Sequence, residues 1–194
     1  KEQYGDERRT EIVPVDMDFS MEDMIAEEEV VLTITHQGYI KRTALNTYRT
    51  QRRGGRGVQG AMSKEEDFVE HLFIANTHNY MLFFTDQGKC YWLKVYDIPQ
   101  GGRAARGRAI VNLIGCDPGE KIEAFVSVKE FDDSHYIAMA TRNGIVKKTV
   151  LSAYGKPRKG GIYAIEIRDG DKLIEARVTN GEHDILLGTS EGKS

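Results

Sequence analysis

The stretch YIAMATRNGIVKKTVL, residues 136–151, contains two apolar runs separated by the turn TRNG. Asn-Gly between β-rich runs is a strong signal for a tight β-hairpin, because glycine readily adopts the positive φ that other residues resist. We therefore predict two antiparallel strands that are joined at residues 141–144.

The same kind of turn, a threonine followed by two polar residues and a glycine, returns along the chain. The four stretches are THQG (35–38), TDQG (85–88), TRNG (141–144) and TSEG (189–192). Their glycines are 50, 56 and 48 residues apart, and the β-rich runs VVLTIT, YMLFFT, YIAMAT and DILLGT precede them. A fixed period of this length is typical of solenoids and propellers.

Each repeat contains further strand candidates on both sides of its hairpin. The runs HLFIA, AFVSV and IEARVT are separated from the hairpins by polar turns, and short strands are also expected within RAIVNL and GIYAIEI. In each of the three repeats a basic, glycine-rich loop leads to such a short last strand, and the loops hold the pairs Arg56-Gly57, Arg106-Gly107 and Lys159-Gly160. We therefore predict an all-β fold of four-stranded blades in a propeller-like array.

Two other architectures agree less well with this pattern. A β-sandwich also has many short strands, but it does not require one turn to return at a regular interval. Helical periodicity is confined to SMEDMIAEE (20–28), which is short and acidic. Because a fourth hairpin begins at TSEG (189–192), we expect an array truncated to about three to four blades.

The formal net charge of −3 conceals a strong segregation of charge along the chain. Residues 38–60 hold six basic residues and no acid, and residues 142–160 hold six and no acid. Residues 88–108 hold five basic residues and one acid. Because the basic windows recur at matching places in the repeats, an array of blades would carry them along one rim. Phosphate binding depends on such local positive potential and not on the mean charge.

The positive rim favours DNA as the partner, bound through its backbone and bent with little sequence preference. No recognition helix or zinc finger that would read base edges is visible. The alternatives are a solvated basic surface, RNA, an anionic membrane, or an acidic protein docked on a propeller-type scaffold.

Other kinds of chemistry find little support in the sequence. The five histidines lack metal-ligand spacing, and the glycine-rich stretches lack the GxxxxGK[ST] phosphate loop, so we expect no catalytic residue, metal or cofactor here. Cys90 and Cys116 form no CxxC motif and are expected in the core of a protein from a reducing, cytoplasmic setting. No apolar run reaches the length of a membrane span.

The segment QRRGGRG, residues 51–57, resembles a box in one known family. It matches the Gln-Arg-Arg-Gly-Gly-Lys/Arg-Gly pattern near the start of the C-terminal domain in the A subunit of DNA gyrase. The Thr-x-x-Gly repeats resemble the blades of that domain, and KEQYGDERRTEI resembles the end of the preceding breakage-reunion region. The resemblance divides the chain into residues 1–27, the end of that region and an acidic linker, and residues 28–194, part of the DNA-wrapping domain.

The resemblance implies a β-pinwheel, usually of six blades, in which neighbouring blades exchange strands. It implies a bacterial, cytoplasmic and nucleoid-associated protein that wraps double-stranded DNA and presents a segment for strand passage. Negative supercoiling would then use ATP and Mg elsewhere in the complex, with the remainder of the gyrase A protein and the gyrase B protein as partners. The box separates this family from the related topoisomerase IV domain, which stays an alternative, and it would join the ends of the wrap or latch the ring. The fragment would be a monomer, or a dimer made by strand exchange.

The predicted DNA-binding residues come from the box and from matching places in the three repeats. They are Lys41, Arg42, Arg49, Gln51, Arg52, Arg53, Gly54, Gly55, Arg56, Gly57, Arg103, Arg106, Arg108, Lys147, Lys148, Arg158 and Lys159.

Two features leave alternatives open. Trp92 occupies the place that Arg42 and Lys148 hold in their repeats, either beside the DNA path or as a local packing exception. The acidic run 16–29 is either a solvated linker or a competitor of DNA for the basic rim.

Overall fold

Three antiparallel hairpins form the frame of the computed structural model, which describes residues 21–48, 67–102, 104–190 and 192. The turn that joins each pair of strands is the predicted Thr-x-x-Gly turn. The paired strands are β1 (Glu29–Thr35) with β2 (Tyr39–Ala44), β4 (Tyr80–Thr85) with β5 (Lys89–Lys94), and β8 (Tyr136–Thr141) with β9 (Val146–Val150).

The turns are built alike, which explains why this motif repeats. In the second hairpin, the Gly88 N–H donates to the Thr85 carbonyl at 2.9 Å, and the Lys89 N–H donates to the Thr85 hydroxyl at 3.1 Å. Gly88 has a φ of +81°, a conformation that glycine adopts without strain. The threonine thus closes the turn with both its carbonyl and its side chain, while buried against the sheet.

A third strand extends each hairpin on the side of its first strand. These strands are β3 (Val69–Asn76) beside β1, β7 (Ile122–Val128) beside β4, and β11 (Leu173–Thr179) beside β8. They correspond to the predicted runs HLFIA, AFVSV and IEARVT, so the prediction that these runs are strands is confirmed. Their predicted grouping is wrong, because each run joins the sheet of the hairpin that precedes it in the chain and not of the hairpin that follows it.

The fourth strand of a sheet comes from the following repeat. Strand β6 (Arg108–Ala109) pairs with β2, giving the order β3-β1-β2-β6, and β10 (Ile162–Tyr163) pairs with β5, giving β10-β5-β4-β7. The third sheet has the order β11-β8-β9 in the described chain. The exchange of strands between blades is therefore confirmed.

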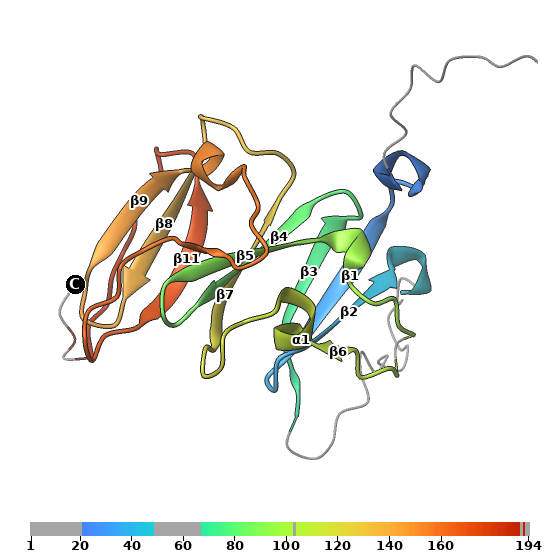
Figure 1. The fold of residues 1–194 in the computed structure, drawn as a ribbon, viewed down its shortest axis with the longest axis horizontal. Helices are drawn as coiled ribbons and strands as arrows, with labels where there is room; N and C mark the ends of the chain where they lie inside the picture. The colour runs from blue at the N-terminus through green and yellow to red at the C-terminus, as the bar shows by residue number, and fades with distance from the viewer. Residues whose placement is uncertain (1–20, 49–66, 103, 191, 193–194) are drawn as a thin grey trace, which may run out of the picture.

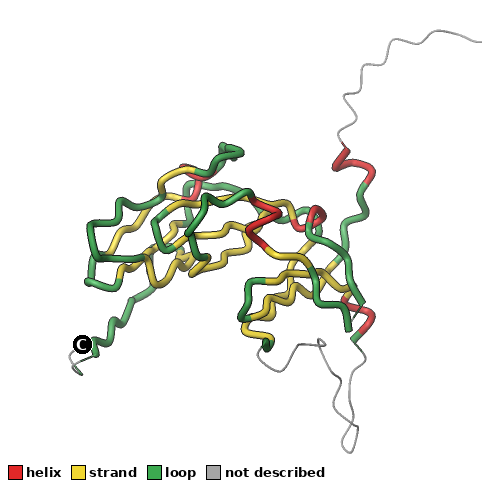
Figure 2. The backbone as a smooth tube through the Cα atoms, turned by 60° about the horizontal axis from the view of Figure 1, so that its bottom comes forward, coloured by secondary structure: helices red, strands yellow, loops and turns green. Residues whose placement is uncertain are grey.

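The three sheets lie side by side, with the second between the first and the third (Figure 1). Figure 2 shows the same strands from another side, in yellow, with the short helical turns in red. One core cluster fills the space between the first and second sheets, and a second cluster fills the space between the second and third. The all-β, propeller-like prediction is confirmed, because each core layer is shared between neighbouring blades.

The short helices are local additions to these sheets. Four of them are 3-10 turns: η1 (Met21–Met24), η2 (Leu45–Thr47), η3 (Val95–Asp97) and η4 (Leu151–Tyr154). The run RAIVNL, predicted as a strand, is a strand only at Arg108–Ala109 and then forms the helix α1 (Ile110–Ile114). Residues Ile110 and Ile114 lie one helical turn apart and are both buried, and Gly115 ends the helix with a φ of +64°. Packing between the blades therefore overrides the β-propensity of this run.

The structure also corrects the matching of the glycines that precede the exchanged strands. The counterpart of Gly107 is Gly161 and not Gly160, because both have positive φ and directly precede β6 and β10. A Cβ on Gly107 would lie 2.4 Å from the Ile40 carbonyl oxygen, and one on Gly161 would lie 2.9 Å from the Cys90 carbonyl oxygen. The strands can approach at these places only because no side chain is present.

Of the fourth predicted hairpin, the described residues show only the contact that closes its turn. The Gly192 N–H donates to the Thr189 carbonyl at 3.0 Å, and Gly192 has a φ of +75°. The preceding run DILLGT, predicted as a strand, has no strand assignment over residues 184–189 and exposes Leu186 almost fully.

Candidate nucleic-acid interface

The two edges of each sheet have different surroundings. At one edge, β11 lies against β7, and the ring of His71 in β3 lies 5.1 Å from that of Phe125 in β7. The edge strands β3, β7 and β11 therefore converge, and the exchanged strands β6 and β10 occupy the opposite edges. We call the segments that lead into the exchanged strands the perimeter loops: residues 98–102 and 104–107 form the first, and residues 155–161 form the second.

The first perimeter loop runs along β2 before it joins the first sheet. The Arg42 N–H donates to the Pro99 carbonyl at 3.0 Å, and the Gly101 N–H donates to the Arg42 carbonyl at 2.9 Å. The Thr43 hydroxyl donates to the Gly101 carbonyl at 2.9 Å. These bonds fix the loop on the outer edge of the preceding blade.

Two predicted residues are presented at the end of this loop. The guanidinium of Arg106 lies over the ring of Tyr39, 3.8 Å from its centroid, and its Nη2 donates to the Gln37 side-chain oxygen at 2.7 Å. Arg108 is exposed on β6, beside Ile40 of β2. Arg106 is thus held in a fixed direction while Arg108 is free to follow a ligand.

The structure corrects the role predicted for Lys41. Its side chain is buried, with 1% of its surface exposed, and its ammonium donates to the carbonyls of Gly102 at 3.1 Å and Ala105 at 2.8 Å. Burial lowers the pKa of Lys41. Adjacent strand residues point to opposite faces, so Lys41 and Arg42 cannot both face one ligand. Lys41 therefore holds the first perimeter loop and does not lie at the surface as a phosphate contact.

Among the described residues, the third repeat exposes the largest number of predicted DNA-binding residues. Arg158 and Lys159 lie exposed in the second perimeter loop, where the Gly161 N–H closes a turn onto the Arg158 carbonyl at 2.9 Å. Lys147 and Lys148 are exposed on β9 and point to opposite faces. The Lys147 ammonium donates to the Ala164 carbonyl at 2.6 Å, and that of Lys148 lies 4.7 Å from the centroid of the Tyr136 ring.

The remaining predicted residues lie outside the described part of the chain. They are Arg49, Gln51, Arg52, Arg53, Gly54, Gly55, Arg56, Gly57 and Arg103. Their proposed contacts with DNA stay predictions.

Two lysines of the middle basic window are neutralised by acids from elsewhere in the sequence. Lys89 pairs with Asp117 and lies 3.5 Å from a carboxylate oxygen of Glu120. The hydrogen bond to Asp117 is the main reason that the pKa of Lys89 is raised. Lys94 donates to Glu22 at 2.5 Å and lies 4.0 Å from the centroid of the Tyr80 ring. Charge counted along the sequence therefore overstates the positive potential of the second blade.

The end of the acidic run is docked on the blades. Besides the Glu22 contact, the Glu28 N–H donates to the Thr77 hydroxyl at 3.1 Å, and this hydroxyl donates to the Ala26 carbonyl at 2.9 Å. The His78 Nε2 lies 2.8 Å from the Ile25 carbonyl oxygen. Residues 22–28 thus lie against the β3–β4 turn, whereas the predicted boundary after residue 27 stays a prediction.

Trp92 is a packing residue. It lies against the core between the second and third blades, and its indole N–H donates to the Tyr154 carbonyl at 2.9 Å. This decides the alternative that the sequence left open. No local pattern signals this contact, because Trp92 and Tyr154 lie in different repeats.

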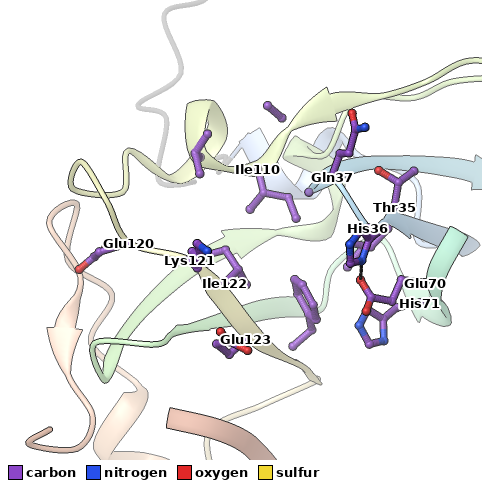
Figure 3. Close-up of a pocket in the computed structure, with 15 residues that line it drawn as sticks. Thr35, His36, Gln37, Glu70, His71, Ile110, Glu120, Lys121, Ile122 and Glu123 are labelled. Carbon is purple, nitrogen blue, oxygen red and sulfur yellow. Dashed lines mark hydrogen bonds and ion pairs between the residues drawn. The ribbon is translucent and has the colours of Figure 1, made fainter. Parts of the chain in front are cut away.

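A cavity of about 470 Å³ lies between the first two blades (Figure 3). Ile110 and Ile122 line it together with residues of the first Thr-x-x-Gly turn, and His36 at its rim lies 3.3 Å from Glu70. The matching space beside Gly88 is filled, because a Cβ there would lie 2.9 Å from the Ile167 side chain. Among the described residues, no group of three or more His, Cys, Asp or Glu side chains is arranged to hold a metal ion.

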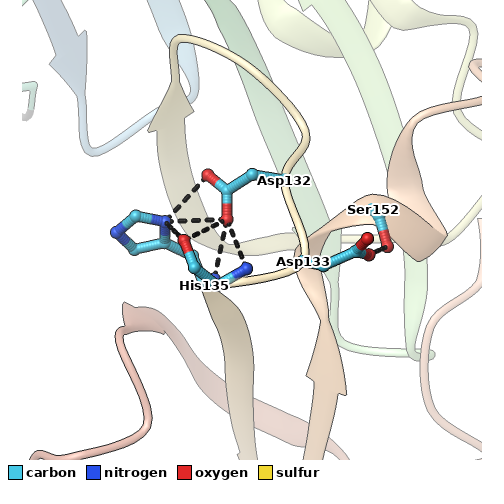
Figure 4. A network of polar contacts seen from close by, with 5 residues as sticks. Asp132, Asp133, His135 and Ser152 are labelled. Atoms are coloured by element: carbon cyan, nitrogen blue, oxygen red, sulfur yellow. Dashed lines mark hydrogen bonds and ion pairs between the residues drawn. The ribbon is translucent and has the colours of Figure 1, made fainter.

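A second polar cluster surrounds Asp132 in the loop between β7 and β8 (Figure 4). Its carboxylate accepts from the N–H groups of Ser134 and His135, both at 2.8 Å, and from the Ser134 hydroxyl at 2.8 Å. The bond from Ser134 is the main reason that the pKa of Asp132 is lowered to about 2. Carboxylate and hydroxyl both approach Nδ1 of His135, whereas a hydrolytic triad uses opposite ring nitrogens. The cluster therefore closes a loop and is not built for nucleophilic catalysis.

The two cysteines are poor nucleophiles. Cys90 is fully buried, as predicted, and burial raises its pKa. Cys116 is half-buried, and burial raises its pKa to about 11. Both thiols therefore stay protonated at neutral pH.

A family model described as the C-terminal domain of DNA gyrase, a β-propeller, matches residues 29–76, 79–129 and 135–180. The chain belongs to the DNA gyrase C-terminal domain family. Each matched segment begins at or near the first strand of a hairpin and ends at or just after the third strand of the same sheet, so family and fold agree blade by blade. No helix in the described residues is long and apolar enough to cross a membrane.

Similar proteins agree with the assignment of the chain to this family. The chain is 51% identical to the A subunit of DNA gyrase from Clostridium acetobutylicum over 192 residues, which are 99% of the chain and 23% of that protein. It is 50% identical to the A subunit of DNA gyrase from Neisseria gonorrhoeae over 194 residues, which are 100% of the chain and 21% of that protein. The chain therefore spans less than a quarter of the length of these relatives.

Solved structures of such domains share the fold. The C-terminal domain of DNA topoisomerase IV superimposes with a TM-score of 0.68 and 31% identity, over 81% of this chain and 48% of that one. A DNA gyrase A C-terminal domain superimposes with a TM-score of 0.61 and 24% identity, over 78% of this chain and 48% of that one.

Proposed function

We propose that the chain binds duplex DNA through its phosphates along the perimeter loops and bends the duplex around the array. On this proposal it is the DNA-wrapping part of a gyrase A protein. It would present a DNA segment for strand passage in ATP-dependent negative supercoiling.

The observation that supports this most is the strand exchange. Because each perimeter loop ends in a strand of the preceding sheet, successive basic loops are fixed at equivalent edges of successive blades. Arg106 and Arg108 lie at one such edge, and Arg158 and Lys159 lie in the next perimeter loop. Duplex DNA carries about one negative charge per 1.7 Å of axis, so a curved row of cations releases counterions along the whole path.

The chemistry of cleavage and ATP hydrolysis would belong to other parts of the complex. On this proposal the chain is non-catalytic and binds no cofactor, and ATP and Mg are used elsewhere. Its partners are double-stranded DNA, the remainder of the gyrase A protein and the gyrase B protein, in the nucleoid of a bacterial cytoplasm.

A topological experiment tests the proposal. Nicked circular plasmid is incubated with the chain, sealed with ligase, freed of protein and resolved into topoisomers. We expect a positive shift in linking number that is reduced in Arg158→Ala/Lys159→Ala and in the box variant Arg52→Ala/Arg53→Ala/Arg56→Ala. The matched control is Lys129→Ala, an exposed lysine in the loop between β7 and β8 that is not among the predicted DNA-binding residues.

The other outcomes separate the alternatives. Salt-sensitive binding without a shift in linking number would mean that the chain holds DNA but does not wrap it. Absence of binding at low salt would refute the proposal and favour a scaffold that docks an acidic protein.

A further inference from the structure

One position on the second strand of the hairpin faces the following blade in the first two repeats. It lies four residues after the turn glycine and holds Arg42 in β2, Trp92 in β5 and Lys148 in β9. Arg42 pairs across its hairpin with Leu32, and Trp92 pairs with Leu82. Leu32 lies in the core between the first and second blades, and Leu82 lies in the core between the second and third. Cross-strand partners share a face, so Arg42 and Trp92 both point toward the next repeat.

Both side chains bind the same place in the next repeat. The Arg42 Nε donates to the Ile98 carbonyl at 2.7 Å, and the Trp92 Nε1 donates to the Tyr154 carbonyl at 2.9 Å. Ile98 caps the 3-10 turn η3, and Tyr154 is the last residue of η4. Ile98 is the first residue of the first perimeter loop, and Tyr154 directly precedes the second. Two chemically different side chains thus make one equivalent hydrogen bond.

We infer that this position is a clasp between repeats: its side-chain N–H positions the perimeter loop of the next blade. The residue type then decides whether the same side chain also offers charge to DNA, a part of the inference that rests on the proposed function. Arg42 uses Nε for the clasp and keeps the N–H groups of its two terminal nitrogens, whereas the single N–H of Trp92 is fully used. At this position the first blade would therefore both hold the perimeter loop of the next blade and bind DNA, whereas the second blade would only hold the loop.

The chain offers matched variants that separate the two roles. In Arg42→Gln the amide nitrogen is as many bonds from Cα as Nε is in arginine, so the clasp is kept and the charge is lost. Arg42→Met loses both. Trp92→Phe keeps a ring but loses the N–H, and Trp92→Arg restores a donor and adds a charge.

Amide hydrogen exchange, followed by NMR on the 194-residue chain, reports the clasp without any DNA. The reporters are Gly101, whose N–H donates to the Arg42 carbonyl, and Gly161, whose N–H donates to the Arg158 carbonyl. Loss of one hydrogen bond should accelerate local exchange about fivefold. We expect this at Gly101 in Arg42→Met and at Gly161 in Trp92→Phe, with parental exchange in Arg42→Gln. Unchanged exchange at Gly144, in the third hairpin, confirms that each variant is folded.

The DNA readout is the dependence of the binding constant on salt. Arg42→Gln should lower the salt slope by about 0.9, and Trp92→Arg should raise it by about 0.9. Parental exchange at both reporters in Arg42→Met and Trp92→Phe would overturn the clasp. If amide exchange changes as expected but the salt slope of DNA binding does not change with the charge of the side chain at position 42 or 92, the clasp stands and the proposed DNA contact fails. If Trp92→Arg does not fold, the pair Arg42→Gln and Arg42→Met decides both questions.

Discussion

Replacing Gly107 by alanine tests the junction between the first two blades. Gly107 has a φ of +90° and directly precedes β6, the strand that the second repeat contributes to the first sheet. A Cβ there would lie 2.4 Å from the Ile40 carbonyl oxygen and 2.8 Å from the carbonyl carbon. These atoms belong to the backbone of β2, so they cannot move aside as a flexible side chain would.

The cost has two parts. A residue other than glycine in a left-handed conformation loses about 1–2 kcal/mol. The clash is relieved only if β6 moves off β2, which loses backbone hydrogen bonds worth about 1 kcal/mol each. We therefore expect Gly107→Ala to lower the free energy of unfolding by about 3 kcal/mol.

Urea unfolding, followed by circular dichroism, measures this free energy. Gly38→Ala is the matched control for the backbone cost alone, because Gly38 has a φ of +78° with nothing within 4 Å of its added Cβ. Gly102→Ala is the neutral control, because its Cβ also meets nothing within 4 Å and its φ is not positive. Equal losses in Gly107→Ala and Gly38→Ala would refute the argument that close strand approach requires this glycine.

Four further predictions concern other parts of the chain. Gly161→Ala should destabilise the chain in urea while Gly160→Ala should not, because a Cβ on Gly161 would lie 2.9 Å from the Cys90 carbonyl oxygen and a Cβ on Gly160 would meet nothing within 4 Å. Lys41→Met should lower the free energy of unfolding by about 1–3 kcal/mol, since two loop carbonyls lose their donor. Arg158→Ala should lower the salt slope of DNA binding by about 0.9 in a titration over several salt concentrations, without changing stability. The pKa of Asp132 is about 2 in the folded chain against 3.8 ordinarily, so its stabilising contribution is complete above about pH 4 and is lost as the pH falls toward 2. Asp132→Asn should flatten this acid limb of the stability curve, measured by thermal unfolding between pH 2 and 6.

The hairpins could be predicted because their determinants are local. Thr85 closes its turn through hydrogen bonds from Gly88 and Lys89, all within five residues of sequence, so the local sequence alone determines the geometry of the turn. The β-rich runs YMLFFT and YIAMAT before these turns then placed β4 and β8 within the limits that the structure shows. The exchange of strands was expected only from the resemblance of the box to a known family, because no local pattern specifies it.

The errors have a common cause in contacts between repeats. Ile110 begins a helix because the space between two blades accepts its buried turn, although its local sequence favours a strand. Lys41 is buried because a loop from the next repeat places two carbonyls above it. Lys94 is neutralised by Glu22, which lies far away in the sequence. Such partners are set by tertiary structure, so a count of residue types along the chain cannot include them.

The strand exchange also determines how the array would carry a mechanical load. The first perimeter loop is anchored by β5 in the second sheet at one end and by β6 in the first sheet at the other. An outward pull on Arg106 therefore divides between two blades and acts on both anchors at once. Tension from a bent, stiff duplex would pull neighbouring blades together through their shared loop, and so the ligand itself would resist the opening of the array.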